Sequence, residues 1–91
     1  MKAIAYGGTM DGKVLSGPFP VCNVPIIPMG KRQVYKAHKC ATVIGGKVVT
    51  ANVWVAKGGE MPGAAHAVTE AMAHGLHEVS DYPMQGVAGG I

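Results

Sequence analysis

The sequence is poor in aromatic residues, in charge and in cysteine. Aromatic residues make up 5% of its 91 residues, so few rings are available on which nucleic-acid bases could stack. The two cysteines, Cys22 and Cys40, are too far apart to form a close-spaced metal motif, and no nucleophile motif surrounds either one. One disulfide between them is an option, but two reduced thiols are the simpler interpretation. We therefore expect neither catalysis nor a cofactor.

Long hydrophobic runs are missing too. The longest uncharged stretch, residues 14–30, contains four prolines, and proline breaks the helix that a membrane crossing needs. Only a few apolar residues separate Lys2 from Gly7, which is too short a run for a secretory signal. We therefore expect a cytoplasmic protein with no membrane partner.

What the sequence does contain is enough apolar residues for one small domain. Hydrophobic residues make up 48% and the mean hydropathy is +0.23, which is too apolar for a disordered chain. The length indicates a single domain over residues 1–91. Residues 1–57 carry all eight Lys and Arg and one acid, a net charge of +7, while residues 58–91 carry four acids and no Lys or Arg, a net charge of −4. This polarity favours an oriented partner or self-association between unlike faces.

Several short apolar runs predict strands. The first covers residues 2–6, and the Asp11-Gly12 pair after it predicts a tight turn into a short strand at residues 14–15. Prolines confine residues 17–28 to an edge strand or a wrapping loop, because proline cannot donate to a sheet ladder. Residues 76–82 can add a last short strand.

The best-defined element is a long β-hairpin made of residues 32–44 and 47–57. A strict two-residue turn at Gly45-Gly46 would place His38 and Cys40 beside the valines of the second strand. A longer, bulged loop would shift the register by one residue and match the two apolar faces better. We expect the bulged register.

One helix is predicted over about residues 62–75. Pro62 suits its first position and Gly75 suits its C-terminal stop. Apolar residues at helical spacing predict the buried stripe, which consists of Met61, Ala65, Val68, Met72 and Leu76. The fold class is therefore α+β, a two-layer sandwich in which an antiparallel sheet of three to five strands carries one helix on one face.

The stretch from Gly7 to Lys13 has the G-x-x-x-x-G-K spacing of a phosphate-binding loop and follows a strand. Three features exclude that function. Val14 stands where Ser or Thr would hold Mg²⁺, the prolines after Leu15 prevent the required helix, and Asp11 would place negative charge in the cradle. We interpret the stretch as a strand and a hairpin turn.

Three potential metal ligands lie in a row on the predicted helix, namely His66, Glu70 and His74 at spacing i, i+4 and i+8. A row on one helix cannot complete a tetrahedral site by itself, and a solvated helix face with His–Glu contacts is the simpler explanation. We therefore assign no metal site and keep these three residues as the candidates if one exists.

Residues 31–39 concentrate positive charge on one predicted strand. Such a strand can bind phosphate groups, although lysines on an exposed edge strand also serve to prevent aggregation. Tyr35 and Trp54 would act as anchors for a partner if they are exposed. The predicted partner-binding site therefore consists of Lys31, Arg32, Tyr35, Lys36, Lys39 and Trp54.

Two stretches resemble known families. The opening YGGTMDGKVL, through its Gly-Gly-x-x-Asp-Gly turn, is similar to the start of many small phage-encoded proteins. The segment from about residue 45 to 75, a Gly-Lys-Val hairpin followed by an Ala/Met helix, is similar to a small anti-CRISPR family acting on type I effector complexes. That family has an antiparallel sheet and one helix, and it works by binding without catalysis.

These resemblances imply a non-enzymatic phage or mobile-element protein in the cytoplasm of a host cell. Its expected activity is to inhibit a host defence complex, a protein or ribonucleoprotein assembly, through protein–protein contacts, as a monomer or a homodimer. Three alternatives stay open. These are a nucleic-acid-binding module that uses residues 31–39, a small-ligand or metal-binding protein, and a structural phage component.

Overall fold

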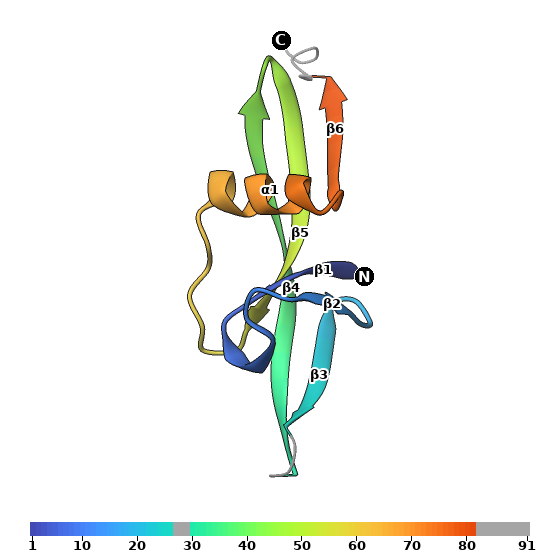
Figure 1. The fold of residues 1–91 in the computed structure, drawn as a ribbon, viewed down its shortest axis with the longest axis vertical. Helices are drawn as coiled ribbons and strands as arrows, with labels where there is room; N and C mark the ends of the chain where they lie inside the picture. Colours follow the sequence, from blue (N-terminus) through green and yellow to red (C-terminus); the bar gives the residue numbers. More distant parts are fainter. Residues whose placement is uncertain (27–29, 82–91) are drawn as a thin grey trace.

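The computed structural model describes residues 1–26 and 30–81. Within them the chain forms a small α+β fold with the elements β1 (Lys2–Tyr6), η1 (Gly8–Met10, a 3₁₀ turn), β2 (Val14–Ser16), β3 (Val21–Ile26), β4 (Lys31–Ile44), β5 (Lys47–Ala56), α1 (Ala64–Ala73) and β6 (His77–Asp81) (Figure 1). Over the described ranges, no helix combines the length and the apolar character that crossing a membrane requires.

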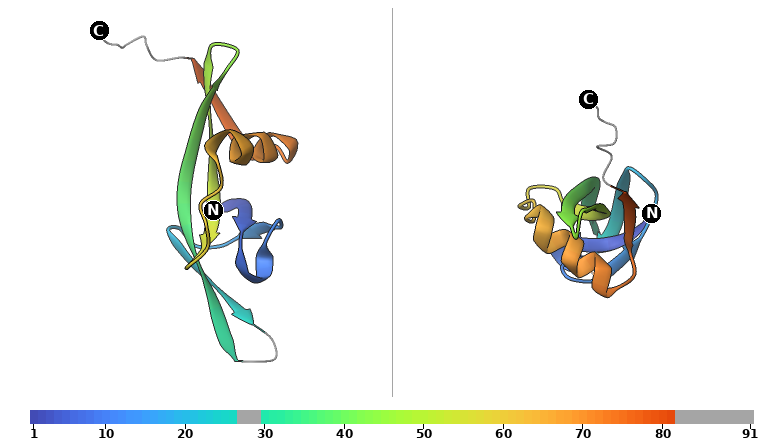
Figure 2. Two further views of the ribbon diagram at one scale, coloured as in Figure 1. Left: turned by 90° about the vertical axis from the view of Figure 1, so that its left-hand side faces the viewer. Right: turned by 90° about the horizontal axis from the view of Figure 1, so that it is seen from above.

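The β4–β5 hairpin is the frame of the molecule. At 3.3 Å per residue its longer strand spans about 46 Å, and Figure 2 shows the hairpin running along the long axis of the molecule, which measures 53 Å. Gly45 and Gly46 have positive φ angles of 60° and 78°, as a tight two-residue turn requires. Ile44 pairs with Lys47, so the register is the strict one. The expectation of a bulged register is therefore wrong.

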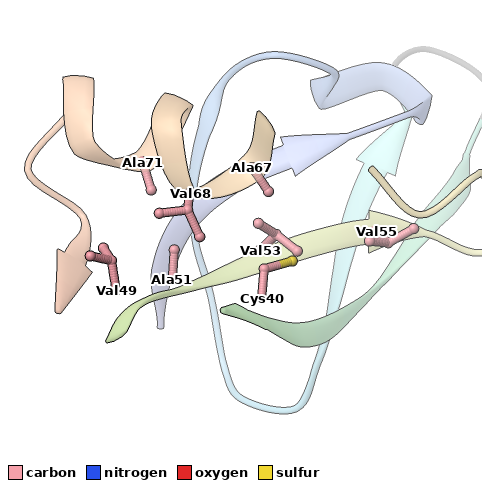
Figure 3. Close-up of a cluster of buried hydrophobic side chains, with 8 residues drawn as sticks. All are labelled: Cys40, Val49, Ala51, Val53, Val55, Ala67, Val68 and Ala71. Atoms are coloured by element: carbon pink, nitrogen blue, oxygen red, sulfur yellow. The ribbon is translucent and has the colours of Figure 1, made fainter. Parts of the chain in front are cut away.

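Both faces of β5 are buried, which removes the apolar mismatch on which the bulge was predicted. We call the side covered by α1 the helix face and the opposite side the inner face. Trp54 and Ala56 lie on the inner face, and Cys40 of β4 packs on the helix face. The buried side chains of β5 on the helix face are those of Val49, Ala51, Val53 and Val55 (Figure 3). Since each face has its own core, the strict register places no large apolar side chain of β5 in water.

The sheet is mixed and has the strand order β2-β1-β5-β4-β3, with β6 also paired to β5. β1 runs parallel to β5 at residues 53–55, and β6 runs antiparallel to it at residues 47–51, so the two lie end to end along one edge. The expected antiparallel sheet of three to five strands is therefore only partly matched. The reason lies in β1, where Ala3, Ile4 and Ala5 are all buried, because strands covered on both faces are typical of parallel pairing.

The sheet curls until its two outer strands approach each other. The Ala37 amide donates to the Pro20 carbonyl ahead of β3 at 2.9 Å, and Leu15 of β2 shares a buried cluster with Cys22 of β3. Trp54 lies inside this curl and donates from Nε1 to the Leu15 carbonyl at 2.9 Å. The expected two-layer arrangement therefore holds only where α1 lies on the sheet, and the other core is enclosed by the sheet itself.

α1 is shorter than predicted, because Gly63 is its N-cap and Pro62 lies outside it. Its end agrees with the prediction. Gly75 has φ 68°, and the Gly75 and Leu76 amides donate to the carbonyls three and five positions back, respectively, in the arrangement of a Schellman motif.

The buried stripe of α1 matches the predicted one only in part. Val68 is buried and Leu76 packs partly buried against the same cluster, but Ala65 is exposed. The helix packs through Ala67, Val68 and Ala71 (Figure 3), whereas Met61 is 48% exposed and Met72 is 39% exposed. Alanine has no side chain beyond Cβ, so a helix that turns alanines inward can approach the sheet closely. The long side chain of Met72 is therefore left on its outer flank, and Met61 lies ahead of the helix.

Candidate binding surface

The two predicted aromatic anchors are not on the surface. Tyr35 and Trp54 are both 0% exposed, so the condition for their role as partner contacts is not met. Tyr35 has a structural role instead. Its hydroxyl donates to the Gly7 carbonyl at 2.7 Å and accepts from the Met10 amide at 2.8 Å, which ties η1 to the hairpin.

The four predicted cations are exposed, but the strand divides them between two faces. Successive side chains of a strand point to opposite sides. Arg32 and Lys36 lie on the helix face, below the part that α1 covers, and Lys36 pairs with Val55. Lys31 and Lys39 lie on the inner face. Residues 31–39 therefore do not form one continuous positive surface.

Lys57 completes a compact group with Arg32 and Lys36. The Lys57 amide donates to the Val34 carbonyl at 2.8 Å, so Lys57 lies opposite Val34. Val34 lies midway between Arg32 and Lys36 on β4. Diagonal neighbours in such a ladder lie roughly 7–8 Å apart. We call Arg32, Lys36 and Lys57 the basic face.

No acidic side chain neutralises the basic face within the described residues. All three side chains are exposed, and no ion pair joins them to any described acid. The β3 residues paired alongside, namely Val21, Asn23 and Pro25, are uncharged. The basic face is therefore suited to an anion supplied by a partner.

Lys57 was missed because the hairpin register was predicted wrongly. In the strict register the residue numbers of each pair add up to 91, so Val34 faces position 57. The bulged register would have moved Lys57 by one position, onto the other face. The glycine pair at the turn was the sequence signal that could have identified it.

The three candidate metal ligands do not form a metal site among the described residues. No group of three His, Cys, Asp or Glu side chains in residues 1–26 and 30–81 is close enough to share an ion. The ring of His66 instead packs edge-on against Tyr6, with centroids 6.3 Å apart. His74 is the C-cap of α1 and Glu70 is exposed.

Tyr6 lies at the border between this helix surface and the core. Its hydroxyl is buried and has no hydrogen-bond partner among the described residues. Burial, and next the negative charge of Glu70, raise the pKa of the Tyr6 phenol above its ordinary value of 10.0. The phenol is therefore held in its neutral form.

The two cysteines are free thiols and both are buried. Burial raises the pKa of the Cys40 thiol above its ordinary value. Because the thiolate is the reactive form of cysteine, this environment makes Cys40 a poor nucleophile.

A pocket of about 290 Å³ lies where the start of β1 meets the start of β6. Its charged lining comes from Lys2, Lys39 and Glu78, with Asn52 contributing an amide. Sites for drug-sized ligands are predominantly apolar, so this pocket is suited at most to a small polar molecule.

The phosphate-loop spacing belongs to a connection between two strands. The loop after Gly7 leads into β2 and not into a long helix. The Asp11 carboxylate accepts from the Gly7 amide at 2.7 Å, so it occupies one of the amides that a phosphate would need. The turn also differs from the expected two-residue hairpin, because η1 precedes it and only Gly12 of the Asp11-Gly12 pair has a positive φ.

The chain matches no protein-family model, no curated protein and no solved structure at a level that indicates relatedness.

Proposed function

We propose that this protein is a non-catalytic binding protein that attaches to a negatively charged surface of a larger partner through its basic face. The observation that carries the proposal is the group of three exposed cations, Arg32, Lys36 and Lys57, none of which is paired with a described acid. Complementary charge speeds association and orients the partner. A host defence complex, inhibited by occupation of one of its surfaces, is the partner that the sequence resemblance predicts.

The case against catalysis rests on the environment of the two thiols. Both are buried, and burial keeps Cys40 in its protonated form. Neither thiol has a hydrogen bond to a histidine within the described residues, which is the pairing that activates a cysteine nucleophile.

The basic face is tested by comparing two variants of equal charge. One carries Arg32→Glu, Lys36→Glu and Lys57→Glu, and its control carries Lys13→Glu, Lys31→Glu and Lys39→Glu. All six side chains are exposed, so neither variant disturbs a core. On a heparin column, the first variant should elute at clearly lower salt than its control. Equal elution of the two would show that net charge alone matters and would overturn the assignment of the face.

A nucleic acid is the second candidate partner, because phosphate groups suit the same three cations. Binding to duplex DNA, followed by fluorescence anisotropy, should then weaken with salt at a slope of about −2.7 for three phosphate contacts. Absence of DNA and RNA binding at low salt would remove this candidate. Capture of a partner complex that survives nuclease treatment, and that the control variant retains, would favour an acidic protein surface.

A further inference from the structure

The outer edge of β4 changes character along its length. Its first residues, 31–36, pair with β3, but no described strand covers the edge beyond residue 37. Figure 1 shows this distal part of β4 extending past α1 with no strand on its outer side. The Ala37 amide donates across this edge to Pro20. By alternation, Lys39, Ala41 and Val43 therefore turn their N–H and C=O groups outward.

These three residues have no hydrogen-bond partner for those groups among the described residues. An uncovered row of this kind is a template for pairing with another strand, and most proteins protect it. After Lys39 the edge contains Cys-Ala-Thr-Val-Ile, without charge, proline or glycine. Val43 is 54% exposed and Ile44 is 43% exposed.

The other sheet edges carry the protection that this one lacks. β3 contains Pro25, which cannot donate to an added strand. β2 is only three residues long and lies close to β3 across the curl. β6 is five residues long and carries two acidic residues, Glu78 and Asp81, and charge on an edge strand opposes the addition of another strand. The distal edge of β4 is therefore the place in the described chain where a strand would add most easily.

We propose that the distal edge of β4 pairs with the same edge of a second copy of this chain, antiparallel about a two-fold axis at Thr42. In that register Ala41 lies opposite Val43 of the second copy, and Cys40 lies opposite Ile44. The single charge, Lys39, then faces the uncharged Gly45, so no two like charges stand directly opposite each other in this register. A two-fold interface of this kind uses one patch twice, and its central Thr42–Thr42 pair is of a type that stabilises sheets.

The oligomeric state tests this pairing. Sedimentation velocity over a dilution series should give a dimer, at twice the 9.3 kDa mass of the chain, that dissociates on dilution. Val43→Lys places a charge on the edge next to Lys39 of the second copy, so it should shift the protein to the monomer. Its control is Val79→Lys on β6, where the replaced side chain is 51% exposed and the charge added is the same.

A cross-link tests the register itself. Thr42 of the two copies forms a pair without mutual hydrogen bonds, in which Cα atoms lie about 4.5 Å apart, within the range of a disulfide. Thr42→Cys should therefore form a disulfide-linked dimer between two copies of position 42 on mild oxidation, identified by peptide mapping, and Val79→Cys should not. A wild-type monomer at every concentration, or a dimer that Val43→Lys leaves intact, overturns the proposal. Loss of the dimer in Val79→Lys overturns it equally.

Discussion

Tyr35 and Tyr6 each have a buried hydroxyl group, and only that of Tyr35 has hydrogen-bond partners among the described residues. In Tyr35→Phe the ring stays in place, but the Gly7 carbonyl loses a donor and the Met10 amide loses an acceptor. A net hydrogen bond contributes about 0.5–1.5 kcal/mol, and a buried group left without a partner costs more. We therefore expect Tyr35→Phe to lower the free energy of unfolding by about 1–3 kcal/mol.

Tyr6→Phe is the matched control. The same hydroxyl is removed, but the hydroxyl of Tyr6 is buried and has no partner among the described residues. Its removal deletes an unsatisfied polar atom and breaks no hydrogen bond, so stability should be unchanged or slightly higher.

Urea unfolding followed by fluorescence measures both effects, because Trp54 is the single tryptophan and lies in the same buried cluster as Tyr35. A loss of about 2 kcal/mol moves the midpoint down by about 1 M for a typical slope of this size class. The slope should stay constant, which shows that the surface exposed on unfolding has not changed. If Tyr35→Phe costs no more than Tyr6→Phe, the hydroxyl of Tyr35 does not hold η1 to the hairpin and the reasoning is wrong.

Three further outcomes follow from buried contacts. Gly17→Ala should cost about 1–3 kcal/mol in the same urea assay, because the new Cβ would clash with the Cys22 sulfur. A Cys22→Ala background should relieve part of that cost, since the Cβ of residue 22 stays at 3.0 Å. Because the pKa of the Tyr6 phenol is raised in the folded state, the folded protein keeps this proton to higher pH than the unfolded chain does. The contribution of Tyr6 to the free energy of unfolding should therefore be constant below pH 10.0 and fall above it. The difference between the pH profiles of the wild type and Tyr6→Phe measures this contribution. Cys40 should react with a thiol reagent at neutral pH only at the rate at which the protein unfolds, and fast labelling in the native state would contradict its burial.

Local signals in the sequence predicted most of the strands. Residues 2–6 were predicted as a strand and form β1. The hairpin strands agree with the prediction at the turn and differ from it by one residue at the start of β4 and one at the end of β5. The Gly75 stop was also predicted, because a left-handed residue after a helix is a local requirement. Alternation, turn glycines and helix caps all act over a few residues, so they can be recognised without knowledge of the tertiary fold.

Features that depend on distant segments could not be obtained in this way. The parallel pairing of β1 with β5 joins residues about 50 positions apart, and nothing within β1 specifies its direction. Trp54 and Tyr35 are polar at one tip, so the sequence allowed them to be surface anchors. Instead, the Trp54 indole donates to the Leu15 carbonyl and the Tyr35 hydroxyl donates to the Gly7 carbonyl. Both carbonyls belong to distant segments that only the folded sheet brings close.

The strict hairpin register connects the core to both proposed surfaces. It puts Cys40 under α1, Trp54 inside the curl and Lys57 across from Val34, and it leaves the outward groups of β4 at odd-numbered residues. A shift of one residue would reverse the face of every side chain on one strand. It would bring Trp54 to the side of α1, where the alanines of the helix leave room only for small side chains. The fit between a slim helix and small residues on one face of β5 therefore fixes the register, and with it the position of the basic face.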